Sequence, residues 1–306
     1  MTINIIMSNK VESYIFNSIN NYFLKYIKED KIIISEKAIE KAEVYHYHRP
    51  NLEKQLNKNS IVTVHHDLED TDPWLDINNY LDRYREAETI VCLNSNQMNI
   101  LKENGITNTV LIPHGVNKEV FKEKQKKINL NDKKTIGIIS KRYVRRVKGE
   151  IKLIEYLKRL DNTKINFIFV GNERRNEYEI AKKYGFESKL IEYLPYELYG
   201  ELYEEIDFLM INSLFEGGPG NLPEAIYSRT PIISRPIAMV SDYLEENING
   251  IKLTDNIDKD VEKINEIIKE ENYKKLIKEI NKYEIKILSW QEVIDKYKEI
   301  YRKIGK

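Results

Sequence analysis

The sequence has very little cysteine and glycine and no long apolar run. Its 306 residues include one cysteine, Cys92, so an internal disulfide is excluded, and a buried free thiol suits a reducing cytoplasm. No apolar run approaches the ~18 residues that a membrane-spanning helix needs, and the start "MTINIIMSNK" lacks the basic and apolar regions of a secretion signal. We therefore expect a soluble protein that stays in the cytoplasm.

An excess of charge of either sign is also missing. Lysine and arginine together number 49, as do aspartate and glutamate, so no net field draws the whole chain to nucleic acid or anionic lipid. A nucleic-acid partner is therefore disfavoured, and any attraction must be local, which leaves a peripheral membrane contact open. A hydrophobic content of 41% can fill a core in each of two domains.

Short β-branched runs alternate with longer amphipathic segments, and this pattern occurs twice along the chain. The runs are too continuous in apolar residues for half-exposed strands; examples are "KIIIS", "SIVTVHH" and "TIVCLN" in the first series and "INFIFVG" and "DFLMINS" in the second. Each series therefore predicts an α/β domain with a parallel sheet covered by helices on both faces. A polar, lysine-rich segment, "NKEVFKEKQKKINLNDKK", lies between them.

The division of the chain follows from these two series and from a helical carboxyl terminus. In "SWQEVIDKYKEIYRKI" the apolar and aromatic residues fall on one stripe of a helix, which must pack on another part of the chain. We predict an N-terminal domain over residues 1–120, a linker over 121–133, a C-terminal domain over 134–285 and a terminal helix over 286–306.

The stretch "SLFEGGPGNLPEAIYSRTPII" concentrates three of the 12 glycines in one turn. It follows the predicted strand "DFLMINS", and in parallel α/β sheets ligands bind at the carboxyl ends of strands. Gly217, Gly218 and Gly220 let the backbone approach a ligand closely and leave amide groups that can point at an anion. The alternative is that the turn is only a surface loop.

A helix is predicted directly after this turn. Asn221 is the expected N-cap, with Leu222 and Pro223 in the first turn. Glu224 then lies at the amino end of the helix, where the helix dipole favours an ionised carboxylate. Because the carboxylates of Glu216 and Glu224 accept hydrogen bonds from hydroxyl groups, the turn suits a ligand with both negative charge and hydroxyls, such as a nucleotide sugar.

Glu216 and Glu224 form an ExxxxxxxE pattern that is followed by "RTPIIS" and "EENINGIKL". Together with "IPHGVN", "SKRYVRRVKG", "LYEEIDFLMINS" and "SWQEVIDKYKEIY", this pattern resembles the retaining glycosyltransferases of GT-B architecture, in the family usually called glycosyltransferase group 1 or family 4. The resemblance covers nearly all of residues 108–304, and it is specific in the second domain and loose in the first. It implies two Rossmann-like, doubly wound domains, with the terminal helix returning to the first domain.

The resemblance assigns roles to residues near the glycine-rich turn. It implies that Glu224 binds the ribose of the donor nucleotide and that Glu216 contacts the transferred sugar near the reacting centre. The amides of Gly217 and Gly218 would hold sugar hydroxyls or phosphate oxygens. Three further residues are placed on the donor side, namely Asn221, Leu222 and Leu194.

In this family an arginine and a lysine after the first strand of the second domain clasp the diphosphate, and these map onto Arg142 and Lys148. Fixed cations stabilise the charge that develops on a leaving diphosphate. Family members usually leave four residues between the two, whereas this sequence has five, so Arg145 and Arg146 compete for the arginine role. The alternative is a solvated basic start of a helix.

Two motifs of the first domain lie in "TVHHDLEDTDPW". His65 or His66 fits the histidine that family members place facing the donor, and strand alternation lets only one of them face it. Asp70 and Asp72 resemble the metal-binding carboxylates of another glycosyltransferase architecture. They are better explained as a turn and an N-cap before a helix that begins at Pro73, so no metal is expected.

These observations predict a retaining, metal-independent glycosyltransferase that uses no cofactor. It would move a sugar from a UDP- or GDP-sugar to a hydroxyl acceptor, glycan or lipid-linked, in the synthesis of glycans, cell wall or surface polysaccharide. The segment "MSNKVES" lacks the glycine-rich loop that often shapes the acceptor site in relatives. Two alternatives stay open: a catalytically silent partner subunit that binds a nucleotide sugar or glycan, and a transferase acting on nucleic acid or protein.

Overall fold

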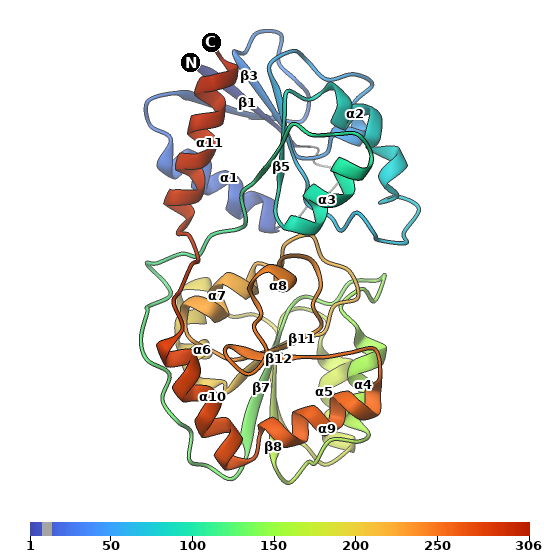
Figure 1. The fold of residues 1–306 in the computed structure, drawn as a ribbon, viewed down its shortest axis with the longest axis vertical. Helices are drawn as coiled ribbons and strands as arrows, with labels where there is room; N and C mark the ends of the chain where they lie inside the picture. Colours follow the sequence, from blue (N-terminus) through green and yellow to red (C-terminus); the bar gives the residue numbers. More distant parts are fainter. Residues whose placement is uncertain (8–13) are drawn as a thin grey trace. The chain divides into compact units, whose positions relative to one another are not determined.

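The computed structural model describes residues 1–7 and 14–306, which divide into two compact units (Figure 1). The first unit contains Met1–Gly115, Glu216–Gly218 and Leu288–Lys306, and the second contains Val116–Phe215 and Pro219–Ile287. All but the first residue of "MSNKVES" lies outside the described residues. None of the helices in the described part of the chain combines the length and the apolar character that a membrane span needs.

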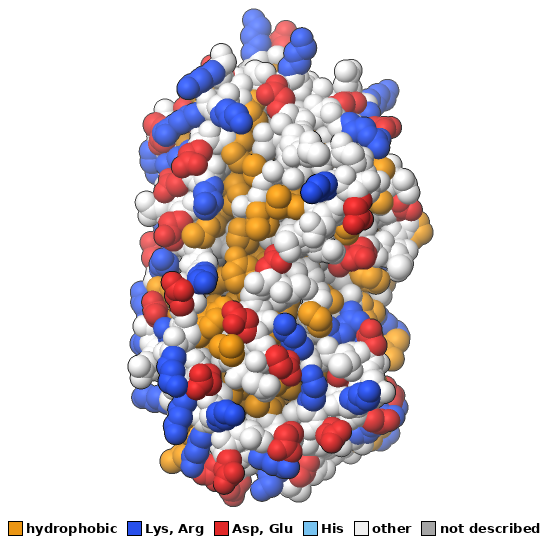
Figure 2. Space-filling model, in the orientation of Figure 1, with side chains coloured by type: hydrophobic (Ala, Val, Ile, Leu, Met, Phe, Trp, Pro, Cys, Tyr) orange, Lys and Arg blue, Asp and Glu red, His pale blue; other side chains and the backbone are white. Residues whose placement is uncertain are grey.

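Neither sign of charge dominates the visible surface of either unit. Figure 2 shows lysine and arginine side chains interspersed with aspartate and glutamate over the face of each unit that is in view. This mixture matches the equal numbers of basic and acidic residues in the sequence, 49 of each.

The first unit is built around a six-stranded sheet in which all neighbouring strands are parallel. In the order β2-β1-β3-β4-β5-β6, the strands are β2 (Lys31–Ser35), β1 (Thr2–Ile6), β3 (Val44–Tyr47), β4 (Ser60–Thr63), β5 (Thr89–Cys92) and β6 (Thr109–Leu111). All residues of β3 and β4 are buried, as expected for apolar runs covered on both faces. Cys92 is buried and free, as predicted, and burial raises the pKa of its thiol to about 12.

The predicted terminal helix returns to the first unit. The helical segments of this unit are α1 (Tyr14–Tyr26), η1 (Pro50–Leu52), η2 (Ile77–Asn79), α2 (Leu81–Glu86), α3 (Ser95–Glu103) and α11 (Trp290–Ile304). A capping box of Ser289 and Glu292 starts α11. Its apolar stripe, including Ile294 and Tyr301, packs in one core with residues of α1 and β1, and Figure 1 shows α11 beside α1.

The prediction of a helix beginning at Pro73 is wrong. Residues 73–75 form a turn, because the carboxylate of Asp72 accepts the N–H of Trp74 at 2.9 Å. The first helical turn is η2, where Asp76 is the cap and its side chain accepts the N–H of Asn78. An aspartate did cap the segment, but the sequence offered several, and the chain uses a later one.

The second unit holds another parallel six-stranded sheet. In the order β12-β11-β10-β7-β8-β9, the strands are β12 (Gly250–Lys252), β11 (Ile232–Ser234), β10 (Phe208–Ile211), β7 (Lys134–Ile139), β8 (Ile165–Val170) and β9 (Glu187–Ile191). The chain builds outward from β7 in one direction and then from β10 in the other. The strand order therefore reverses between β7 and β10, and in such sheets ligands bind at the carboxyl ends of these two strands.

Helices cover both faces of the second sheet. They are α4 (Glu150–Leu157), α5 (Arg175–Lys183), η3 (Tyr196–Leu198), α6 (Tyr199–Glu205), α7 (Asn221–Tyr227), α8 (Ala238–Tyr243), α9 (Ile257–Ile267) and α10 (Glu270–Lys282). Phe167 and Phe169 of β8 lie in one core with α4, α5, α9 and α10, whereas Ile168 and Val170 lie in another with α6, α7 and α8. This alternation along one strand confirms the predicted fold, a doubly wound sheet.

Candidate functional site

The loops that leave β7 and β10 are joined to each other at the point where the strand order reverses. The N–H of Leu214 donates to the carbonyl of Val147 at 2.8 Å, and the amide of Asn212 donates to the carbonyl of Gly149 at 2.6 Å. Gly149 has a φ of +72°, and a Cβ atom there would lie 1.9 Å from the carbonyl oxygen of Asn212. The sequence therefore needs glycine at this position to bring the two loops together.

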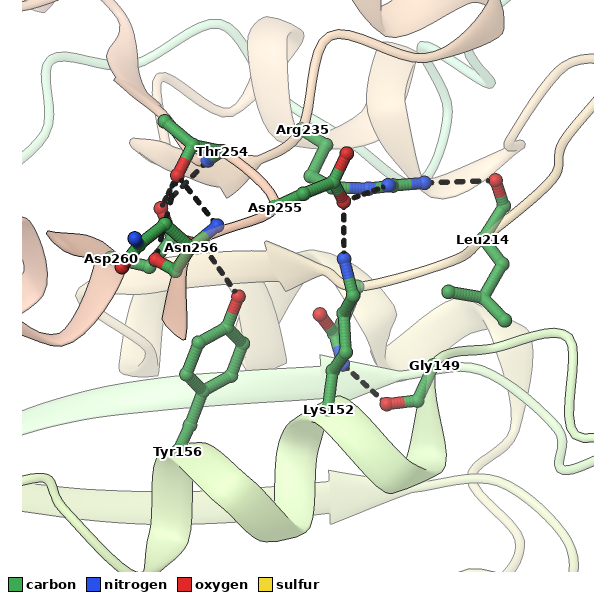
Figure 3. Close-up of polar contacts among 10 residues, drawn as sticks. Gly149, Lys152, Tyr156, Leu214, Arg235, Thr254, Asp255, Asn256 and Asp260 are labelled. Atoms are coloured by element: carbon green, nitrogen blue, oxygen red, sulfur yellow. Dashed lines mark hydrogen bonds and ion pairs between the residues drawn. The ribbon is translucent and has the colours of Figure 1, made fainter. Parts of the chain in front are cut away.

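A third loop fixes the chain just before Glu216. Arg235, which follows β11, donates from Nη2 to the carbonyl of Leu214 at 3.0 Å and from Nη1 to Asp255 at 2.6 Å (Figure 3). Lys152 of α4 donates to the same carboxylate oxygen of Asp255 at 2.5 Å. Arg235 thus holds the Leu214 carbonyl, and Asp255 and Lys152 in turn hold Arg235.

Buried ion pairs lie on the other side of β7. Arg174 is 1% exposed and donates to the carbonyl and hydroxyl oxygens of Ser140, at 2.8 and 2.6 Å. Its Nη1 lies 3.8 Å from Glu150, and Nε of Arg142 lies 3.4 Å from Glu177. Glu150 and Glu177 are 2% and 0% exposed, so each buried carboxylate depends on a guanidinium group for charge balance.

The two predicted diphosphate-binding residues lie on the loop after β7. Arg142 points toward α5 and lines a cavity of about 450 Å³, whose other walls come from the loops after β8 and β9 and from α5. Nζ of Lys148 lies 5.6 Å from the ring centre of Tyr143, within cation–π range. The structure thus places both cations at the carboxyl edge of the sheet, each held by a neighbour that the sequence did not reveal.

Glu224 is held by two tyrosine side chains. Tyr196 Oη donates to Oε1 and Tyr203 Oη donates to Oε2, both at 3.0 Å. Glu224 lies in the first turn of α7 as predicted, but burial raises the pKa of its carboxyl to about 7. The helix dipole alone would favour the ionised form, and desolvation outweighs it.

Asn221 is not the N-cap of this helix, so that prediction is wrong. The cap is Gly220, and Asn221 is the first helical residue. The reason is that its side-chain amide donates to the carbonyl of Ile139 at the end of β7, at 2.9 Å. Leu222 packs wholly inside the core, and Leu194 packs partly buried against the same core.

Glu216 and the two glycines after it belong to the first unit, where they approach the end of β4. A Cβ atom at Gly217 would lie 2.2 Å from the carbonyl oxygen of His65, so only glycine fits there. The carbonyl of Gly217 accepts from Asn94 at 2.7 Å, and the N–H of Glu216 donates to Asp67 at 3.3 Å. Gly218 would place a Cβ atom 3.0 Å from Leu93.

The two predicted histidines follow the end of β4 and have different neighbours. Nε2 of His65 lies 2.7 Å from Nδ1 of His48, whereas the ring of His66 lies 4.3 Å from the ring of Tyr80. Burial lowers the pKa of His66 to about 3 and holds that of His65 well below its ordinary value. His65 keeps part of its surface exposed and His66 does not.

Several residues at this edge were missed by sequence reasoning, namely Tyr196, Tyr203, Arg174, Glu177 and Arg235. Tyr196 stands in "LPYEL" close to the predicted Leu194, which was the one available signal. Asp70 and Asp72, which raised the question of a metal, instead accept backbone N–H groups at 3.0 and 2.9 Å. Over residues 1–7 and 14–306, no three His, Cys, Asp or Glu side chains lie close enough together to hold a metal ion.

Known proteins match both the sequence and the fold. A model of the family described as "Glycosyl transferases group 1" matches residues 120–285, which apart from Glu216–Gly218 belong to the second unit. The chain is 24% identical over 318 residues to an uncharacterized glycosyltransferase of Methanocaldococcus jannaschii. That alignment covers 99% of this chain and 86% of the relative.

Two solved structures illustrate the likeness in fold, which is the GT-B architecture. Sucrose-phosphate synthase from Thermosynechococcus elongatus matches with a TM-score of 0.77 and 13% identity, covering 99% of each chain. A variant of TarM from S. aureus, in complex with fondaparinux, alpha-GlcNAc-glycerol and UDP, matches with a TM-score of 0.65 and 18% identity. That match covers 85% of this chain and 56% of TarM, so the chain spans about half the length of that protein.

Proposed function

The chain belongs to the glycosyl transferases of group 1, and on that premise we propose that it moves a sugar from a UDP- or GDP-sugar to a hydroxyl acceptor. The proposal includes retention at the anomeric carbon, no metal and no cofactor. The observation that carries it is the meeting of two loops at the reversal point of the second sheet, one with Arg142 and Lys148 and the other leading to Glu216. Open α/β sheets bind nucleotides at this place.

The charges of the second unit suit a nucleoside diphosphate. The leaving diphosphate gains negative charge as the bond to the sugar breaks, and Arg142 and Lys148 stabilise that charge from fixed positions. Glu224 accepts hydrogen bonds from the ribose, and Glu216 contacts the transferred sugar. Asn221, Leu222, Leu194 and the amides of the glycine-rich turn complete the donor site.

The acceptor is assigned only by its chemical class, a hydroxyl-bearing glycan or lipid-linked molecule. No carboxylate nucleophile is implied, so the acceptor oxygen bonds to the anomeric carbon as the bond to the diphosphate breaks, and the leaving phosphate takes the proton of the acceptor hydroxyl. His65 or His66 faces the donor. The TarM complex with UDP and alpha-GlcNAc-glycerol supports a nucleotide donor and a sugar-bearing acceptor for this fold. On this basis we assign the chain to the synthesis of a glycan, cell wall or surface polysaccharide, acting in the cytoplasm.

Substitution of Glu216 by Gln tests the chemistry. The expected result is a fall in kcat of about tenfold or more with a much smaller change in donor affinity, because Glu216 acts near the reacting centre. Turnover and affinity are measured with UDP- and GDP-sugars, following hydrolysis of the donor when no acceptor is known. Equal losses in turnover and affinity would remove Glu216 from the reacting centre.

Two measurements separate this proposal from a metal-dependent mechanism and from a catalytically silent protein. Turnover should continue in EDTA, and strong inhibition would contradict the metal-free mechanism. A chain that binds a nucleotide sugar yet never hydrolyses or transfers it would instead be the catalytically silent partner subunit.

A further inference from the structure

The carboxylate of Glu224 is fixed from two directions before any ligand arrives. Tyr196 belongs to η3 and Tyr203 belongs to α6, and their hydroxyls reach different oxygens of Glu224 at the same distance, 3.0 Å. A carboxylate that receives one donor on each oxygen cannot rotate without losing both hydrogen bonds. The plane of the Glu224 carboxylate is therefore set by the protein itself.

The two tyrosines are in turn held by one aromatic side chain. The ring of Phe121, which is fully buried, contacts the ring of Tyr203 at 5.4 Å and that of Tyr196 at 5.9 Å, both edge to face. Tyr203 is 0% exposed, and its hydroxyl lies closer to Glu224, at 3.0 Å, than to the carbonyl oxygen of Asn221, at 3.3 Å. Because the order is established in the free protein, binding does not lose free energy in fixing these side chains.

The two tyrosines leave acceptor capacity on the Glu224 carboxylate. A carboxylate offers roughly four lone-pair positions, two on each oxygen. The tyrosines occupy one position on each oxygen of Glu224, which leaves one on each. Glu224 keeps part of its surface exposed, and these remaining positions match in number the two hydroxyl groups of a ribose.

We propose that Tyr196 and Tyr203 are positioning residues that present the Glu224 carboxylate to both hydroxyls of a ribose, so that the site selects ribonucleotides over 2′-deoxyribonucleotides. This inference rests on the proposed function, because it needs a nucleotide at Glu224. A 2′-deoxy ligand leaves one oxygen of the partly buried carboxylate without its donor, and an unmet acceptor of this kind costs affinity.

The selection depends on pH in a way that identifies the tyrosines. Burial raises the pKa of Glu224, and the hydrogen bonds from Tyr196 and Tyr203 lower it, with a net value of about 7. These two hydroxyls, from η3 and α6, are the titratable groups that act on the carboxyl group. Loss of either one raises the pKa, so the ionised form that accepts both ribose hydroxyls then requires a higher pH.

The test measures affinities for UDP and 2′-deoxy-UDP, and for GDP and 2′-deoxy-GDP, by isothermal titration between pH 5.5 and 8.5. The ratio of ribo to deoxy affinity cancels the titration of the nucleotide phosphates, which both ligands share. For the unaltered chain we expect a preference for ribose of about tenfold at pH 8 that declines at lower pH. In Tyr203→Phe and Tyr196→Phe the preference for ribose should fall to about twofold. The pH at which the preference reaches half of its maximum should rise by roughly half a pH unit or more.

Tyr156→Phe is the matched control. Tyr156 is also fully buried in the second unit and donates to a carboxylate, that of Asp260, at 2.9 Å (Figure 3). The substitution removes the same kind of hydrogen bond without changing the surroundings of Glu224. The stability of the protein should therefore fall, while the preference for ribose and its pH midpoint stay unchanged.

Three outcomes would overturn the inference. The tyrosine variants could keep the full preference, they could lose affinity for ribo and deoxy ligands equally, or Tyr156→Phe could change the preference as they do. If Glu224→Gln abolishes the preference and the tyrosine variants do not, the proposed function survives and the inference fails alone. If the unaltered chain binds neither UDP nor GDP, both fail.

Discussion

Each unit has its own parallel, doubly wound sheet, but the two units differ in the polar side chains that they bury. The first unit buries histidines, and the second buries ion pairs. All five histidines of the chain lie in the first unit, and His46, His48 and His66 are buried there. The second unit has instead buried ion pairs, with Arg174 between Glu150 and Ser140. The two units therefore differ in their buried groups: histidines whose pKa values are lowered in the first, and carboxylates paired with arginines in the second.

The difference explains why the donor is assigned to the second unit. In the first, His46 lies 2.8 Å from both Tyr301 and Thr63, and Thr63 lies 3.0 Å from Tyr297, so a chain of neutral groups ties α11 to the sheet. The three hydrogen-bonded side chains of this network, those of His46, Thr63 and Tyr301, carry no fixed positive charge. The second unit supplies Arg142 and Lys148 on one loop, and the family match covers this unit.

The largest effect is expected from breaking the charge balance of the second unit. Arg174→Met leaves the buried carboxylate of Glu150 without its partner, so the free energy of unfolding should fall by about 3–5 kcal/mol. Arg175→Met is the matched control, because Arg175 is 65% exposed and its ion pair with Glu192 should contribute no more than about 1 kcal/mol. Urea denaturation measures the free energy of unfolding of both variants. Similar losses for Arg174→Met and Arg175→Met would contradict the larger contribution assigned to the buried ion pair.

The pH dependence of stability should have opposite signs for the buried histidines of the first unit and for Glu224 of the second. Burial lowers the pKa of His48 and His66 to about 3 and that of His114 to about 4. Below pH 6.5 these histidines become protonated in the unfolded chain but stay neutral in the folded chain. Each such histidine then lowers the free energy of unfolding by up to about 1.4 kcal/mol per pH unit. Glu224 behaves oppositely: its pKa is raised to about 7, so its contribution is present at low pH and lost as pH rises from 4.5 to 7.

Urea denaturation at pH 5.5 and 7.5 checks this contrast. His66→Gln should make the gain in stability between the two pH values smaller, because one acid-sensitive group is removed. Glu224→Gln should make it larger, because the opposing group is removed. A change in the same direction for both variants would contradict the assigned pKa shifts.

The smallest effect concerns the neutral network of the first unit. Tyr301→Phe removes the hydroxyl beside Nδ1 of His46, and the free energy of unfolding should fall by about 1–2 kcal/mol because a buried ring nitrogen loses its partner. The same substitution at Tyr26, which stacks on Tyr22 with 6.3 Å between ring centres and is only partly buried, should cost less. An equal cost would show that the buried hydrogen bond contributes nothing beyond ring packing.

Sequence reasoning succeeded where one pattern dominates locally. Apolar runs such as "INFIFVG" are short, continuous and rich in β-branched or aromatic residues, which favours a buried strand. Each predicted run contains a strand in the structure. The helix after the glycine-rich turn and the return of α11 were also predicted, because an apolar stripe must be buried.

It failed where several residues could satisfy the same backbone group. Asp72 and Asp76 were both able to cap a helix, and Asn221 turned to the end of β7 although its position favoured an N-cap. The ionisation of Glu224 was misjudged because desolvation depends on side chains brought from η3 and α6. Lys126 lies in a segment that its composition marks as a linker, yet it is buried and donates to the carbonyl groups of Tyr203 in α6 and of Ile206 just after it.

The central claim is that the second unit binds a nucleoside diphosphate through Glu224. Isothermal titration of UDP and of GDP into the unaltered chain and into Glu224→Gln tests it most directly. We predict that one of the two nucleotides binds and that the substitution weakens its binding by about tenfold. Failure of both to bind, or equal affinity in the variant, would contradict the account.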